Sequence, residues 1–136
     1  MTSKALLATA LSITLALTTL PVHAETPAAP LNGADLFKRK CSACHQLTGQ
    51  GIPGAFPALA GDKFVLTKDD REIIKTVLNG RGGMPSFAAS TDDATLAAIL
   101  TYIRSSWGNH APAVTVQTVS TVRKSIPGGV SNAIGN

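Results

Sequence analysis

The chain has 136 residues, with 12 lysines and arginines against 8 aspartates and glutamates, so its formal net charge is +4 at pH 7. Hydrophobic residues make up 44% of it, which excludes an intrinsically disordered chain, and the length allows one domain. Two cysteines are too few for a disulfide-rich scaffold, and with aromatic residues at only 4% the core needs another source of volume.

The first 24 residues have the layout of a secretory signal peptide. Lys4 provides a positive start, an apolar run follows from Ala5 to Leu20, and Val22-His23-Ala24 resembles the small-residue site at which such peptides are cleaved. The alternative is a retained membrane anchor, but the run contains Ser and Thr and is shorter than the roughly 20 apolar residues of a spanning helix. We therefore expect cleavage after Ala24, export to a bacterial periplasm, and no later membrane span.

Residues 25–30 are typical of a flexible leader, because prolines at 27 and 30 disfavour regular structure in this short segment. The first helix is expected directly after it. Asn32 is a good N-cap for a helix from Gly33 to about Ala43, with Leu36 and Phe37 on its inner side.

The segment from Gln46 to Lys63 is predicted to be a loop. Glycines at 49, 51, 54 and 61 and prolines at 53 and 57 disfavour a helix or a strand there. A loop of this length is uncommon in a compact domain, so it needs something to wrap around.

A second helix is expected to start at Thr67, with Asp70 as its partner in a capping box. Its apolar residues recur at helical spacing: Ile73, Ile74, Val77 and Leu78. Asn79-Gly80 is a stop signal, and a turn-rich segment follows from Arg81 to Pro85.

The third helix has the clearest pattern. Ser90 or Thr91 is the expected cap, and Asp92 and Asp93 fill the first turn. One apolar stripe follows along the helix: Leu96, Ile99, Leu100 and Ile103. We expect this helix to end near Trp107.

The tail, residues 109–136, is less regular. Val116, Val119 and Val122 fit a short helical face, which the segment from Ile126 to Gly129 breaks. It is either a strap packed over the domain or a loosely packed C-terminus, and the pattern favours the loosely packed C-terminus.

The candidate site is Cys41-Ser42-Ala43-Cys44-His45, a C-x-x-C-H motif of the kind to which c-type haem is attached. On a helix the two cysteines lie about one turn apart on one face, so both sulfurs can form thioethers with one porphyrin. His45 follows directly and can serve as the proximal iron ligand. A thioredoxin-like interpretation lacks its βαβ setting, and a zinc site lacks a second Cys/His pair.

Three segments together resemble the class I, single-haem bacterial cytochromes c: Cys41–His45, Phe56–Gly61 and Gly83–Phe87. The resemblance extends from Leu31 to about Trp107. The ending from Trp107 to Pro112 and the Val-rich tail are similar to cytochrome domains attached to periplasmic dehydrogenases. The resemblance implies an all-α cytochrome c fold over residues 31–108, with three main helices and loops enclosing one covalently bound haem.

The resemblance also implies axial ligation of the iron by His45 and Met84. After signal cleavage Met84 is the only methionine and His110 the only other histidine. A core-filling role for Met84 is the alternative, and His110, expected to be exposed, is the rival ligand. The carbonyl of Pro57 matches the family position that accepts the proximal His ring N–H, although a proline there also fits a plain turn.

Two further residues match family positions, and two others could contact a haem propionate. Gly33 and Tyr102 correspond to the close crossing of the first and last helices, which is a packing role. Arg81 can pair with a haem propionate or be a solvated loop residue, which is the favoured interpretation. Trp107 can donate to a propionate through its indole N–H or simply pack in the core.

These features predict a periplasmic one-electron carrier rather than an enzyme, either free or as a subunit of an oxidoreductase complex. The expected partners are redox proteins, namely a periplasmic dehydrogenase, a reductase or a terminal oxidase. Residues 38–40, Lys-Arg-Lys, form either a weak docking patch or a solvated helix face, and no nucleic-acid motif accompanies them. The alternative function is a haem enzyme or gas-binding sensor with an open sixth coordination position.

Overall fold

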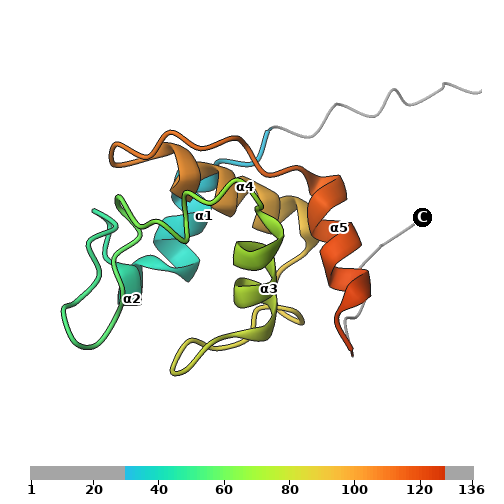
Figure 1. Ribbon diagram of the computed structural model, residues 1–136, viewed down its shortest axis with the longest axis horizontal. Coiled ribbons are helices and arrows are strands. Elements are labelled where there is room, and N and C mark those ends of the chain that lie inside the picture. Colours follow the sequence, from blue (N-terminus) through green and yellow to red (C-terminus); the bar gives the residue numbers. More distant parts are fainter. Residues whose placement is uncertain (1–29, 128–136) are drawn as a thin grey trace, which may run out of the picture.

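The computed structural model describes residues 30–127, so the expected signal peptide (1–24), nearly all of the leader and residues 128–136 lie outside the described residues. Figure 1 shows the helices of the described part in chain order: α1 (Gly33–Lys40), α2 (Ser42–His45), α3 (Arg71–Asn79), α4 (Asp93–Ser105) and α5 (Val116–Ser125). Within that part the backbone forms no strand beyond two isolated bridges. The predicted all-α architecture is therefore confirmed.

The crossing of α1 and α4 is the centre of the fold. Asn32 caps α1 as predicted, because its side-chain oxygen accepts from the Ala34 N–H at 3.1 Å. A Cβ on Gly33 would overlap the Ala98 carbonyl oxygen and lie 2.9 Å from the Tyr102 Cβ. The predicted close packing of Gly33 against Tyr102 is thus confirmed, because only glycine lets the two backbones approach this far.

The core around this crossing is mostly aliphatic. A cluster of three rings covers one end of it, where Phe37, Tyr102 and Trp107 have centroids 5.1–5.5 Å apart. The buried aliphatic residues come from every helix except α2: Leu36, Ile73, Ile74, Leu78, Leu96, Ile99, Leu100, Ile103, Val119 and Val122. The stripes predicted for α3 and α4 are on their buried faces, except that Val77 is only partly buried.

Three helix ends differ from the predictions. Cys41 has a φ of −125° and interrupts the first helix, so α1 ends at Lys40 and α2 continues from Ser42. The second helix does not start at Thr67, because the Thr67 carbonyl accepts from the Arg104 guanidinium and Asp70 is the N-cap of α3. Asp92 caps α4 in place of Ser90 or Thr91, since its carboxylate accepts from the Thr95 N–H at 2.7 Å.

The prediction of a loosely packed C-terminus is wrong for the described residues. Thr115 caps α5, which packs against α3 and α4 and buries Val119 and Val122 completely or nearly so (Figure 1). The valine spacing correctly indicated a helix, but two buried valines form too narrow an apolar stripe to predict that the helix packs on the domain. Arg123, also buried, completes the packing through polar contacts. No helix within residues 30–127 is long and apolar enough to cross a membrane.

Candidate haem site

Both cysteines of the motif are free thiols and partly buried, Cys41 at the junction between α1 and α2 and Cys44 within α2. The pKa of the Cys41 thiol is raised to about 11, chiefly by burial, with the Lys40 charge lowering it and Cys44 adding a smaller raising effect. The thiol is therefore protonated at neutral pH. Disulfide exchange chemistry requires a thiolate, so this environment does not favour a thioredoxin-like activity.

His45 is buried at the end of α2, and its ring orientation is fixed by one hydrogen bond. Nδ1 lies 3.0 Å from the Pro57 carbonyl oxygen. A carbonyl can only accept, so Nδ1 carries a hydrogen, and in the neutral ring the lone pair is then on Nε2. Nε2 makes no hydrogen bond among the described residues. This is the arrangement of an imidazole prepared to ligate a metal through Nε2.

The loop between residues 46 and 63 closes on itself through glycine backbone groups. The Gly51 N–H donates to the His45 carbonyl at 3.0 Å, and the Gly49 carbonyl accepts from the Leu59 N–H at 2.7 Å. Gly49 has a φ of +68°, and a Cβ there would lie 2.5 Å from the Trp107 ring. Only glycine meets both conditions, so the loop can pack flat against the end of α4.

The segment after α4 fastens this loop from the other side. The Trp107 indole N–H donates to the Leu47 carbonyl at 3.0 Å, so it is already engaged, and of the two predicted roles the packing one is observed. Asn109 is 0% exposed and accepts from the Gly61 N–H at 2.8 Å. Its amide also donates to the carbonyls of Leu59 and Ile103, at 3.1 and 2.8 Å.

Met84 lies on the turn after α3. Two backbone hydrogen bonds with Arg81, of 3.0 and 3.1 Å, close this turn, and the Met84 side chain is partly buried. Arg81 is exposed, with its guanidinium 5.7 Å from the centre of the Phe64 ring, in agreement with the solvated loop residue that we favoured. His110 is exposed, as expected.

The residues present fit a haem. Three large apolar side chains of the loop region are left unburied by the protein, with Leu47 58%, Ile52 41% and Phe64 36% exposed. A flat apolar group would provide the cover that these side chains lack. The donor set matches as well, because it comprises two free thiols, an imidazole with a free lone pair and a thioether on a closed turn.

An all-helical domain with a C-x-x-C-H motif at the end of its first helical pair has the architecture of a single-haem, class I-like cytochrome c. A family model described as cytochrome c oxidase, cbb3-type, subunit III matches residues 28–103, more than half of the chain. The chain belongs to this family.

Several bacterial cytochromes are similar to the chain. Cytochrome c-552 of Thermus thermophilus is 38% identical over 93 residues, which cover 57% of this chain and 70% of the relative. The cytochrome c subunit of alcohol dehydrogenase (quinone) from Gluconacetobacter polyoxogenes is 31% identical over 107 residues, 70% of this chain but 23% of that subunit. The cbb3-type cytochrome c oxidase subunit FixP of Bradyrhizobium sp. (strain ORS 278) is 35% identical over 79 residues, 56% of this chain and 27% of the subunit.

The family and these relatives confirm the predicted electron-carrier function and the covalently bound c-type haem. The chain spans about a quarter of the length of the dehydrogenase subunits that it matches. Sequence analysis missed the buried polar residues Asn109, Arg104 and Arg123. The only sequence signal for them was position, at or after the end of the apolar stripe of α4.

Proposed function

We propose that this chain is a periplasmic one-electron carrier in which Cys41 and Cys44 attach the haem and His45 and Met84 ligate its iron. The observation that supports this best is the hydrogen bond from His45 Nδ1 to the Pro57 carbonyl, 3.0 Å long, in a buried imidazole directly after the second cysteine. It leaves Nε2 as the only nitrogen of that ring able to bind a metal.

Each of these residues has a definite task. Cys41 and Cys44 would hold the haem, each thiol adding across one vinyl group with its hydrogen passing to the neighbouring vinyl carbon. When bound, the haem supplies an iron that accepts one electron and gives it up again. The Pro57 carbonyl holds the His45 ring and raises its basicity. The thioether of Met84 favours the reduced state and so raises the reduction potential.

The partner is proposed to be another redox protein in a periplasmic complex or chain. The relatives include proteins named as cytochrome c subunits of alcohol and gluconate dehydrogenases and as subunits of cbb3-type oxidases. The basic end of α1 offers a place for an acidic partner, because Lys38 and Arg39 are exposed there. Lys40 is less available, since its ammonium group donates to the Ser90 carbonyl at 3.2 Å.

The experiment is expression of the full chain in a host that matures c-type cytochromes. We expect a periplasmic protein whose N-terminus is Glu25 and whose haem resists acid–acetone extraction. The oxidised protein should have the weak far-red absorption band given by methionine bound to ferric haem iron. Met84→Leu should abolish that band and lower the reduction potential, whereas His110→Ala should change neither.

The opposite result is equally specific. A wild-type protein without the methionine band that binds carbon monoxide readily when reduced would replace this proposal by the haem enzyme or gas sensor with an open sixth position. Loss of the band in His110→Ala rather than in Met84→Leu would transfer the ligand role to the histidine.

A further inference from the structure

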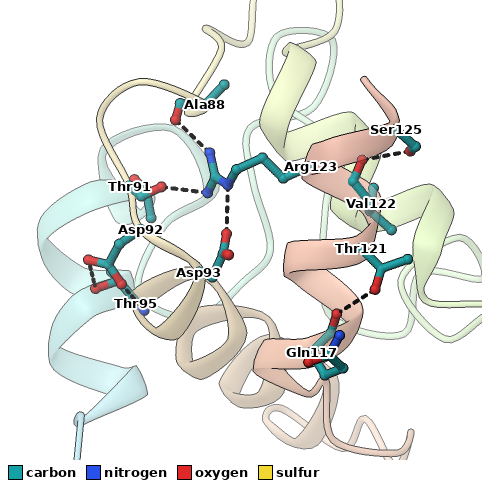
Figure 2. Close-up of polar contacts among 10 residues, drawn as sticks. All are labelled: Ala88, Thr91, Asp92, Asp93, Thr95, Gln117, Thr121, Val122, Arg123 and Ser125. Carbon is teal, nitrogen blue, oxygen red and sulfur yellow. Dashed lines mark hydrogen bonds and ion pairs between the residues drawn. The ribbon is translucent and has the colours of Figure 1, made fainter. Parts of the chain in front are cut away.

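Arg123 on α5 is a buried cation whose three guanidinium nitrogens all donate to a neighbouring segment. It is 1% exposed. Its Nε donates to the Asp93 carboxylate at 2.6 Å, Nη1 to the Ala88 carbonyl at 2.6 Å and Nη2 to the Thr91 carbonyl at 2.7 Å (Figure 2). One side chain therefore joins α5 to the start of α4 and to the chain just before it.

We define the Met84 loop as residues 80–91. Two of the three Arg123 contacts, to Ala88 and Thr91, are in its second half, where the chain returns from Met84 towards α4. The loop leaves α3 at Gly80 and comes back along the same helix. The Ser86 hydroxyl donates to the Leu78 carbonyl at 2.5 Å, and the Ala88 N–H donates to it at 3.3 Å. From Ala88 to Thr91, Arg123 on α5 and Lys40 on α1 hold the loop by side-chain hydrogen bonds to its carbonyls.

The Arg123 contacts are stronger than ordinary loop contacts. A charged donor in a dry environment makes short hydrogen bonds that are roughly twice as strong as neutral ones. Asp93 is 20% exposed at its side chain, so the ion pair is mostly shielded from water. Loss of the guanidinium would leave the carbonyls of Ala88 and Thr91 without these donors, and the Asp93 charge without its partner.

We propose that Arg123 is a positioning residue for Met84: by fixing the second half of the Met84 loop, it keeps the thioether at the iron and slows its displacement by external ligands. This inference rests on the proposed ligation by His45 and Met84. It assigns to α5 a role in the redox site, although α5 contributes no ligand to it.

Arg104 provides a matched control. It is also 1% exposed, and its guanidinium also makes three hydrogen bonds. The acceptors are the backbone carbonyls of Val65, Thr67 and Pro112. None of these acceptors belongs to the Met84 loop. A substitution of either arginine removes a buried guanidinium and lowers stability, but only Arg123 should affect the methionine ligand.

The test uses the haem-loaded full chain and its variants Arg123→Lys, Asp93→Asn and Arg104→Lys. The oxidised protein is mixed with cyanide, which binds only after methionine leaves the iron, and amide hydrogen exchange is followed at Phe87 and Ala88. Arg123→Lys should accelerate cyanide binding about tenfold or more, because one charge-assisted hydrogen bond corresponds to about that factor. The two amides should exchange faster by a similar factor, and Arg104→Lys should leave both rates within about twofold of wild type.

Asp93→Asn covers the case in which Arg123→Lys does not fold, since it retains the two carbonyl contacts and should give a smaller acceleration in the same direction. Unchanged cyanide binding in a folded Arg123 or Asp93 variant that keeps the methionine band overturns this inference alone. Equal acceleration in Arg104→Lys also overturns it, by indicating a general loss of stability. Absence of the methionine band in wild type overturns the proposed ligation, and this inference with it.

Discussion

Replacement of Asn109 by alanine should destabilise the loop wall of the haem site more than any other single change after α4. Asn109 is fully buried and makes three hydrogen bonds, accepting from the Gly61 N–H and donating to the carbonyls of Leu59 and Ile103. Two of these partners, Gly61 and Leu59, are in the 46–63 loop, and the third, Ile103, is in α4, so Asn109 links the loop to that helix. The side chain thus replaces a strand pairing that the glycine-rich loop cannot form.

The size of the effect follows from these contacts. A typical intramolecular hydrogen bond contributes about 1 kcal/mol, so the loss of three predicts about 3 kcal/mol of lost stability. The loss is larger if the partner groups stay dry, because each unsatisfied buried group costs about 1–3 kcal/mol. For a domain of this size, 1 kcal/mol lowers Tm by about 4–8 °C, so a decrease of about 12–24 °C is expected.

The assay is thermal unfolding of the haem-loaded protein, with the adjacent exposed residue as the control. His110→Ala should stay within about 0.5 kcal/mol of wild type, as surface substitutions usually do. Amide hydrogen exchange should accelerate at Gly61 in Asn109→Ala and remain unchanged in His110→Ala. If the two variants have the same Tm, or if the Gly61 amide exchanges at the wild-type rate, Asn109 does not hold the loop.

Three further predictions concern the helices that support the site. Gly33→Ala should lower the free energy of unfolding by about 1–3 kcal/mol, because the added methyl group meets the backbone of Ala98. Gly83→Ala is the control and should have little effect, because the space there is open. Equal urea midpoints for the two variants would contradict the close crossing of α1 and α4. Burial alone would raise the pKa of Asp92, but hydrogen bonds from the Thr95 N–H and hydroxyl lower it below its ordinary value. The folded-state pKa is therefore lower than the unfolded-state pKa. The stability that Asp92 contributes is complete above the unfolded-state pKa and is lost as the pH falls through the folded-state pKa. Asp92→Ala should therefore cost about 1 kcal/mol at neutral pH and progressively less in acid, and a cost that does not change with pH would refute this. The Thr91 hydroxyl is buried with no hydrogen-bond partner within residues 30–127, so Thr91→Val should leave stability unchanged or raise it by up to about 1 kcal/mol, and a clear loss would reveal a missing partner.

The helices were predictable where an apolar stripe and a cap coincide. The stripe from Leu96 to Ile103 predicted the buried face of α4, and Asn32 predicted the start of α1. The C-x-x-C-H motif indicated a covalently bound haem because its residues are contiguous, although the structure breaks the helix at Cys41. These features share one property, which is that the residues that determine them are close together in the sequence.

Buried polar residues were not predictable for the opposite reason. Arginine is seldom fully buried, so nothing in the sequence singled out Arg104 or Arg123 as core residues. Their acceptors are 32–39 residues away in the case of Val65, Ala88 and Thr91, and no periodicity links such positions. The tail was therefore predicted to pack loosely, since its two buried valines are insufficient without the contacts of Arg123.

The low aromatic content of the chain is matched by apolar side chains of the 46–63 loop that the protein leaves exposed. Three backbone groups of the 46–63 loop pair with the segment after α4: the Gly61 N–H and the Leu59 carbonyl bond to Asn109, and the Leu47 carbonyl accepts from the Trp107 indole. Leu47 and Ile52 remain exposed on the loop, since side chains within residues 30–127 do not bury them. The loop thus combines a backbone fixed by α4 with apolar side chains that gain burial only from a bound group. A bound haem would supply this apolar cover, and the apolar surroundings that these side chains provide would favour the less charged, reduced state of its iron and so raise the reduction potential.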